Sequence, residues 1–325
     1  MSEDNSQALA ADRFIDDNNS AVAESVDDSS LACFRSSVLA YHEENGRTYH
    51  SMSAGKYFIP NDEQEQDRLD LHHHLMLLTL DDKLALCPKN ETAKRVLDLG
   101  TGTGIWAINY ADAHPETQVI GVDLSPIQPD YVPPNCQFEV DDVEKEWTWS
   151  SKFDFIYARN LGGSFADHQS MIQKCFDNLE SGGYLEMWDI GLPVTSDDGT
   201  LTEQHALSEM SHLTVRAAAA LGRPIDNTTR YKNMFEQAGF ENVQMRMFKW
   251  PSNQWPADKK HKTLGMWNCA NIDSGLEGLT LFLFTRGLGM SKEECLAYCA
   301  KARKELRDTH IHAYWPMYCC YGKRP

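Results

Sequence analysis

The stretch RVLDLGTGTGIW, residues 95–106, places three glycines directly after a short apolar run. The run predicts a buried parallel strand over residues 96–99, and the chain then turns at Gly100 into a helix that begins near Ile105. Such a turn brings backbone N–H groups and a helix N-terminus close to a ligand, because glycine has no Cβ atom to prevent close approach. The stretch therefore predicts a site for a phosphate or carboxylate group.

Two common phosphate-binding motifs do not fit this turn. The dinucleotide fingerprint GxGxxG matches Gly100 and Gly102 but requires a glycine where the sequence has Ile105. The P-loop motif fails because no Gly-Lys-Ser/Thr follows at the required distance. The turn is instead marked by Asp98, two residues before the first glycine, and by the alternation of glycines up to Gly104.

Strands and helices continue to alternate after the turn. Further strands are expected over residues 118–122, 137–140, 153–158, 184–188 and 241–250, with a last one after Pro316, since proline lacks the N–H that a paired strand needs. Helices are expected at about 171–179 with a stop at Gly182 and Gly183, within 201–222, over 231–238 before Gly239, and after the capping box of Ser291 and Glu294. This βαβ repetition predicts an α/β fold with a doubly wound, mostly parallel seven-stranded sheet and helices on both faces.

The chain divides into three parts by composition. Residues 1–32 are acidic and polar, with Arg13 as the one basic residue, so they predict a disordered acidic tail that is either plainly solvated or an interaction segment. Residues 33–90 are expected to form an N-terminal lid and helix. Residues 91–325 follow as the α/β domain, with helical insertions near 192–225 and 256–308.

The segment before the first strand combines aromatic residues with a helical pattern. Asn61 and Gln64 resemble a capping arrangement for a helix over about 62–80. Such a segment can lie across a ligand pocket. Tyr49 and Tyr57 would then be flat covers for the ligand, or they would simply pack in the core.

Charge and hydropathy exclude several classes of function. The formal net charge is -18 and the pI is about 5.0, which argues against non-specific binding to nucleic acid or an anionic membrane, because both need clustered Lys and Arg. No apolar run approaches the roughly 20 residues that span a bilayer, and the N-terminus lacks the features of a signal peptide. We expect a protein of the cytoplasm or nucleus that binds neither nucleic acid nor membrane directly.

The cysteines and histidines do not predict a metal site. The nine cysteines are scattered, odd in number and free of CxxC spacing, so reduced thiols without disulfides are expected. His72, His73 and His74 are consecutive, so on a helix they point in different directions rather than to one ion. A solvated or partly packed helix face is the expected structure there.

Acidic residues follow the expected strands in a regular order. Asp98 precedes the glycine turn, and Asp123 ends the second strand about 20 residues further on, where a carboxylate can accept hydrogen bonds from two adjacent hydroxyls. Asp141 and Asp142 follow the third strand. Each one alone is more typical of a turn or helix cap, but the ordered series indicates a ligand site.

This series resembles the S-adenosylmethionine turn of class I methyltransferases. The resemblance implies that the glycine loop lies against the methionine part of the cofactor, that Asp123 binds the ribose, and that Asp142, favoured over Asp141, lies at the adenine amine with Val143 beside the ring. Arg159 and Asn160 follow the fourth strand, where an open α/β sheet presents its ligand crevice. The cofactor residues expected are Asp98, Gly100, Thr101, Gly102, Thr103, Gly104, Asp123, Leu124, Asp142, Val143, Arg159 and Asn160. The alternative is a nucleotide-binding relative with another use.

Longer blocks narrow the resemblance. HEENGRTYH, GKYFIPNDEQEQDRLDL, GTGTGIWAI, GVDLSPIQP, PPNCQFEV, RNLGGS and IHAYWPMYCCYGKRP are similar to fungal LaeA-like methyltransferases, from about residue 41 to the end. The resemblance implies a class I, Rossmann-like fold, S-adenosylmethionine and an association with secondary metabolism. It leaves the methyl acceptor open, since members are associated with regulation through velvet-type protein partners or with modification of metabolites.

Methyl transfer needs little side-chain chemistry. It is an in-line displacement, so the enzyme mainly aligns an acceptor atom and excludes water. A hydroxyl or amine acceptor would need a base, for which His50, His168, Glu186 and Asp189 are candidates, whereas a carboxylate would need none. The sequence favours an enzyme that methylates a small secondary metabolite, with a regulator acting through protein partners or protein methylation as the alternative and a non-methylating reaction such as a cyclisation as a third.

Overall fold

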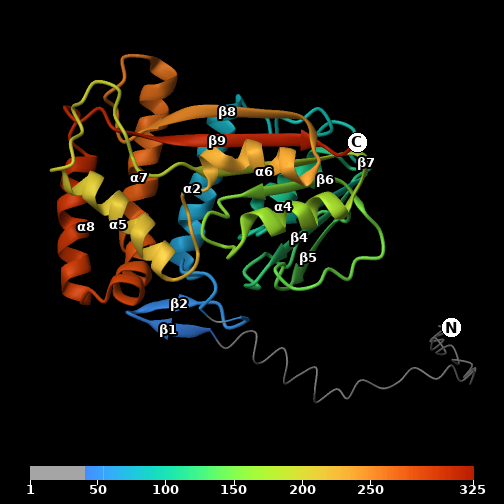
Figure 1. Ribbon diagram of the computed structural model, residues 1–325, viewed down its shortest axis with the longest axis horizontal. Coiled ribbons are helices and arrows are strands. Elements are labelled where there is room, and N and C mark those ends of the chain that lie inside the picture. Colours follow the sequence, from blue (N-terminus) through green and yellow to red (C-terminus); the bar gives the residue numbers. More distant parts are fainter. Residues whose placement is uncertain (1–40, 54) are drawn as a thin grey trace, which may run out of the picture. The chain divides into compact units, whose positions relative to one another are not determined.

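The computed structural model describes residues 41–53 and 55–325 (Figure 1), so the expected tail over residues 1–32 lies outside the described part. Its main sheet has seven strands in the order β5-β4-β3-β6-β7-β9-β8. Their bounds are β3 Arg95–Leu99, β4 Gln118–Asp123, β5 Cys136–Val140, β6 Phe153–Arg159, β7 Leu179–Ile190, β8 Glu241–Pro251 and β9 Tyr314–Lys323. A two-stranded ribbon, β1 His42–Glu44 and β2 Arg47–Tyr49, precedes the sheet in the chain.

The direction of the strands confirms the predicted fold class. Strands β3 to β7 pair in parallel, while β9 runs antiparallel to both β7 and β8. Connections between parallel strands require crossovers, and α3 Ile105–Ala113 provides the one from β3 to β4, as α4 His168–Asp177 does from β6 to β7. The result is the doubly wound, mostly parallel seven-stranded sheet that the sequence predicted.

Helices cover both faces of the sheet because apolar residues point from the strands to both sides. One face packs against α2 Glu63–Leu80, α3 Ile105–Ala113 and the first part of α7 Lys259–Phe282. The other face packs against α4 His168–Asp177 and α6 Tyr231–Ala238, which lie in front of the sheet in Figure 1. The sheet is thus buried on both sides, as its nearly continuous apolar strands require.

A separate helical layer stands beside one end of the sheet. It consists of α5 Ala206–Ala220, α7, the π-helical turn Leu283–Gly287 and α8 Lys292–Leu306, which gather on the left of Figure 1. A 3-10 turn, Thr228–Arg230, leads into α6. The capping box of Ser291 and Glu294 begins α8 with both reciprocal hydrogen bonds in place. The helices α5, α7 and α8 lie within the ranges 192–225 and 256–308.

Three local expectations were wrong. The N-cap of α2 is Asp62, whose carboxylate accepts from the Glu65 N–H, whereas Asn61 turns inward and donates to Ser125. Strand β7 already begins at Leu179, so the glycines at 182 and 183 lie within it rather than ending a helix. Pairing of β9 begins at Tyr314 and includes Pro316. Proline is tolerated at this position because it takes part through its carbonyl, which accepts from the Gly191 N–H just beyond the end of β7, so the missing N–H of Pro316 is not needed.

Candidate functional site

A first cavity of about 1090 Å³ opens at the carboxyl ends of β3, β4, β5 and β6. Its walls come from the glycine turn, from the residues that follow these strands, from α2 and from the N-terminal strap, which we define as residues 50–53 and 55–61. All of the cofactor residues expected from the sequence line it except Asp98 and Gly104. The carboxyl end of the sheet therefore collects residues from six separate segments around one space.

The glycine turn requires glycine for steric reasons. Gly100 and Gly104 have φ of +64° and +79°, in the left-handed region that L side chains rarely adopt. A Cβ atom on Gly100 would lie 2.4 Å from Leu161 Cδ2, and one on Gly104 would lie 2.4 Å from Phe138 Cζ. Gly104 thus packs beneath the turn as the N-cap of α3, while the residues before it face the cavity.

Two of the carboxylates hold the turn in shape. Asp98 is buried behind it and accepts a hydrogen bond from the Thr101 hydroxyl at 2.6 Å, and burial raises its pKa to about 7. Asp123 lines the cavity and accepts from the Gly102 N–H and the Ser125 N–H, both at 2.9 Å. Each Asp123 oxygen keeps a second lone pair for a ligand hydroxyl. Burial raises the pKa of this carboxyl too.

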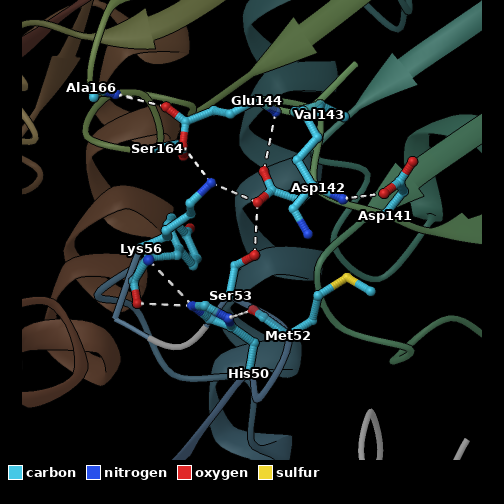
Figure 2. A network of polar contacts seen from close by, with 12 residues as sticks. His50, Met52, Ser53, Lys56, Asp141, Asp142, Val143, Glu144, Ser164 and Ala166 are labelled. Carbon is cyan, nitrogen blue, oxygen red and sulfur yellow. Dashed lines mark hydrogen bonds and ion pairs between the residues drawn. The ribbon is translucent and has the colours of Figure 1, made fainter. Parts of the chain in front are cut away.

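Asp142 is bound by the N-terminal strap (Figure 2). Its Oδ2 accepts from Ser53 Oγ at 2.7 Å and from Lys56 Nζ at 2.6 Å, and its Oδ1 accepts from the Glu144 N–H. Burial opposes ionisation, but the hydrogen bonds from Lys56 and Ser53 outweigh it and hold the pKa of Asp142 below its usual range. The carboxylate expected at the adenine amine is therefore engaged by the chain itself.

The same network reaches two further segments. Glu144 lies 3.2 Å from Lys56 Nζ and accepts from the Ala166 N–H and from Arg223. Arg223 in turn donates to the Ser164 carbonyl. The strap is thus tied by charge to the loops that follow β5, β6 and α5.

A second cavity of about 1080 Å³ adjoins the first. The two share Tyr57, Ile59, Leu69, His72 and Asn160 as lining residues. The remaining wall is mostly apolar and comes from the helical layer and the sheet end, including Ile190, Leu207, Met210, Ile225, Trp250, Ile272, Leu276 and Trp315. A wall of this apolar character suits a largely apolar small molecule.

The few charged groups around the second cavity are already partnered. Arg68 donates to Glu65 through Nε and Nη2 and to Asn271 through Nη1, so its charge is neutralised within the wall. Asp189 accepts from the Tyr231 hydroxyl at 2.6 Å and the Gly162 N–H at 2.8 Å, and burial raises its pKa to about 6. Arg68 therefore presents no unpaired charge to a ligand, whereas the Asp189 carboxyl is held only by neutral donors.

Two histidines of α2 reach the site, although the sequence predicted only a helix face. His72 and His73 are buried at 5% and 2% exposure, whereas His74 is exposed. Asn160 Nδ2 lies 3.0 Å from His72 Nε2, and Arg159 Nη1 lies 3.1 Å from His73 Nδ1. Helical phase could have indicated which of the three histidines faces the site, because residues 65, 68, 69 and 72 lie on one face of the helix.

The other predicted site residues lie away from both cavities. Tyr49 is buried against Phe282, unlike Tyr57, which lines both cavities. His50 contacts the carbonyls of Met52 and Tyr57 within the strap. Two more candidates for the base are engaged by groups outside the cavities. His168 contacts Asn227, and burial lowers its pKa to about 4. Glu186 accepts from the N–H groups of Leu86 and Cys87. Of the expected bases, Asp189 alone lines a cavity.

The structure shows neither disulfides nor a metal centre in its described part. Eight cysteines there are free, and no group of three or more His, Cys, Asp and Glu residues could hold an ion. The residues present do fit S-adenosylmethionine. The glycine turn, where a Cβ atom would not fit, lets the ligand approach the backbone closely. The free lone pairs of Asp123 match its hydroxyls, and the guanidinium of Arg159 matches its carboxylate. Apolar Val143 and Phe165 match its adenine.

Fold and site together define a class I S-adenosylmethionine-dependent methyltransferase. The chain belongs to the methyltransferase domain family, whose model matches residues 71–245. It is similar to methyltransferase pytC of Aspergillus terreus, with 39% identity over 92% of each chain. It is also similar to protein-methionine methyltransferase laeA of Emericella nidulans, with 34% identity over 88% of this chain and 77% of laeA. A third relative, secondary metabolism regulator LAE1 of Cochliobolus heterostrophus, is 34% identical over 87% of this chain and 94% of LAE1.

Proposed function

We propose that this enzyme methylates an apolar small molecule of fungal secondary metabolism, bound in the second cavity. The observation that carries the proposal is the mostly apolar space of about 1080 Å³ that shares a wall with the cofactor-side cavity. The wall of this space comes from α2, α5, α7 and the sheet end and offers apolar contacts on several sides. The 39% identity to pytC, which is named a methyltransferase, supports methyl transfer as the reaction.

The chain's contribution to such a reaction is mainly to position and to exclude water. S-adenosylmethionine supplies a methyl group on a positively charged sulfur. The glycine turn and Asp123 would hold the cofactor, and the strap with Tyr57 would close the side that faces solvent. Bringing two reactants together in a dry site accelerates a displacement without covalent participation of the protein.

Regulation through proteins is the second candidate. It is supported by the similarity to laeA and LAE1, which are named as a protein-methionine methyltransferase and as a regulator of secondary metabolism. In that case the acidic segment over residues 1–32 would bind a partner, of velvet type by the family resemblance, and the protein would act in the nucleus rather than the cytoplasm. None of the described helices is long and apolar enough to cross a membrane.

One experiment separates these functions. The purified full-length protein is incubated with methyl-labelled S-adenosylmethionine and fungal extract, and small molecules are then separated from proteins. The proposal expects label in a discrete small compound. Asp123→Ala should abolish both labelling and cofactor binding, because the ribose-side carboxylate is lost, whereas Asp112→Ala, on the exposed face of α3, should change neither.

Other distributions of label would contradict the proposal. Label confined to protein would favour the regulator, and removal of residues 1–32 should then abolish partner capture without an enzymatic defect. Tight cofactor binding with no label in either fraction would favour a reaction other than methyl transfer.

A further inference from the structure

The wall between the two cavities contains three side chains with polar atoms, Tyr57, His72 and Asn160. Any acceptor atom that meets the methyl group must lie beside this wall, since it is the part shared by both spaces. An amide such as Asn160 does not accept a proton at neutral pH. Burial raises the pKa of Tyr57, so its hydroxyl stays protonated. His72 remains as the one group of this wall that can receive a proton.

His72 is held in a defined position. Its ring centroid lies 4.9 Å from that of Trp250, whose Nε1 donates to Thr79 Oγ1. Asn160 Nδ2 lies 3.0 Å from Nε2 and 3.2 Å from Nδ1 of the same ring. Asn160 has φ of +56°, a left-handed conformation that is fixed by the hydrogen bond from its N–H to the Trp188 carbonyl. Such uncommon backbone at a cavity wall is typical of functional positions.

The charged groups around His72 favour its neutral form. Arg68, Glu65 and His73 lie on its own helix, Arg159 comes from the end of β6, and Asp189 comes from the end of β7. Burial, followed by the charges of Arg159 and Arg68, lowers the pKa of His72 well below its ordinary value. The imidazole is therefore uncharged at physiological pH, and its acceptor nitrogen, which accepts from Asn160 Nδ2 in this structure, can accept from a substrate hydroxyl in its place, although it is a weak base.

We propose that His72 is the base of the methyl transfer and that the acceptor is an uncharged, acidic hydroxyl of phenol or enol type. This inference rests on the proposed function. A carboxylate acceptor would meet the ionised Asp189 and an arginine whose donors already bind Glu65 and Asn271. A phenol or enol is a stronger acid than an alkanol, so it gives up its proton more readily to a weak base.

The step balances as follows. The acceptor O–H bond breaks, and the proton goes to a ring nitrogen of His72. The oxygen keeps the electron pair and forms a bond to the methyl carbon, while the carbon–sulfur bond breaks with its pair on sulfur. His72 then loses its proton to solvent.

The test uses four naphthalene probes that share one apolar frame. These are 2-naphthol, 2-naphthylmethanol, 2-naphthoic acid and 6-cyano-2-naphthol, whose hydroxyl is more acidic than that of 2-naphthol. The full-length enzyme should methylate the two naphthols and leave the alkanol and the acid unlabelled. Preferential labelling of the acid or alkanol, or no labelling of 2-naphthol by an enzyme that labels a small molecule in extract, would overturn the assignment.

Variants separate proton transfer from packing. His72→Gln should lower kcat for 2-naphthol by roughly 100- to 10,000-fold and by a smaller factor for 6-cyano-2-naphthol, since a more acidic hydroxyl depends less on the base. The Kd of 2-naphthol without cofactor, measured by fluorescence titration, should change less than about threefold, because the frame of the pocket is kept. His74→Gln is the matched control, as this exposed histidine of the same helix lines neither cavity.

An equal fall of kcat for both naphthols would mean that His72 has only a structural role and would refute the inference. Failure of the proposed function gives a different pattern. In that case wild-type enzyme labels neither naphthols nor small molecules of the extract although it binds S-adenosylmethionine.

Discussion

The two cavities differ in the way their walls are made. The cofactor-side cavity is bounded by backbone turns and carboxylates at strand ends, which are fixed by hydrogen bonds such as those of Asp123 to Gly102 and Ser125. The acceptor-side cavity is bounded by aliphatic and aromatic side chains from the sheet end and the helical layer. The first recognises a ligand through polar groups in set directions, whereas the second selects by shape. Changes in one wall should therefore leave binding in the other largely intact.

The Glu65–Arg68 ion pair joins the two walls, since Glu65 lines the first cavity and Arg68 the second. Arg68→Met leaves the Glu65 carboxylate, 1% exposed, without its partner. We expect the free energy of unfolding to fall by about 3–5 kcal/mol in urea denaturation, because an unpaired buried charge is strongly unfavourable. Glu65→Met combined with Arg68→Met should recover most of that loss. A single-variant loss below about 1 kcal/mol would mean that water reaches Glu65.

Filling the acceptor-side cavity tests whether the two walls act independently. Leu279→Trp adds an indole to this wall from α7 and should weaken 2-naphthol binding at least about tenfold, a loss of about 1.4 kcal/mol. Calorimetric affinity for S-adenosylmethionine should stay within about twofold. Leu296→Trp, an exposed position on α8, should leave both affinities unchanged. Equal weakening of both ligands by Leu279→Trp would show that the cavities form one coupled space.

The smallest effect concerns the strap. Lys56→Met removes the cation that holds Asp142 ionised and should lower stability by less than about 1 kcal/mol at pH 7, because Lys56 is 31% exposed. Since the pKa of Asp142 is lowered in the folded state, this contribution is present above the ordinary pKa of Asp, about 3.9, and is lost as the pH falls through the folded value.

The measurement is the difference in Tm between wild type and Lys56→Met across pH. It should shrink on acidification below pH of about 4. Lys260→Met, which breaks an ion pair to the exposed Asp81, should show no measurable difference at any pH. A wild-type advantage that persists in acid would assign the contact to packing rather than charge.

Local patterns predicted most of the lining of the cofactor-side cavity but only scattered residues of the acceptor-side cavity, such as Tyr57 and Asp189. The glycine turn and the acids after successive strands lie in short segments, and parallel strands bring their carboxyl ends to one edge by geometry. The acceptor-side cavity draws on residues as distant as Tyr57, Asp189, Leu276 and Trp315, whose meeting depends on how helices pack. The engagement of Asp142 by Lys56 likewise depends on where the strap folds. His72 was missed because three consecutive histidines differ only in helical phase.

The position of β9 in the sheet has a consequence for biosynthesis. This strand lies between β7 and β8 in the sheet although both precede it in the chain. The helices α7 and α8 are translated after β8 and before β9. Until β9 emerges from the ribosome, the inner edges of β7 and β8 expose unpaired backbone groups, and such edges invite pairing with other chains. We therefore expect nascent chains that end before Tyr314 to depend on chaperones and to aggregate when released.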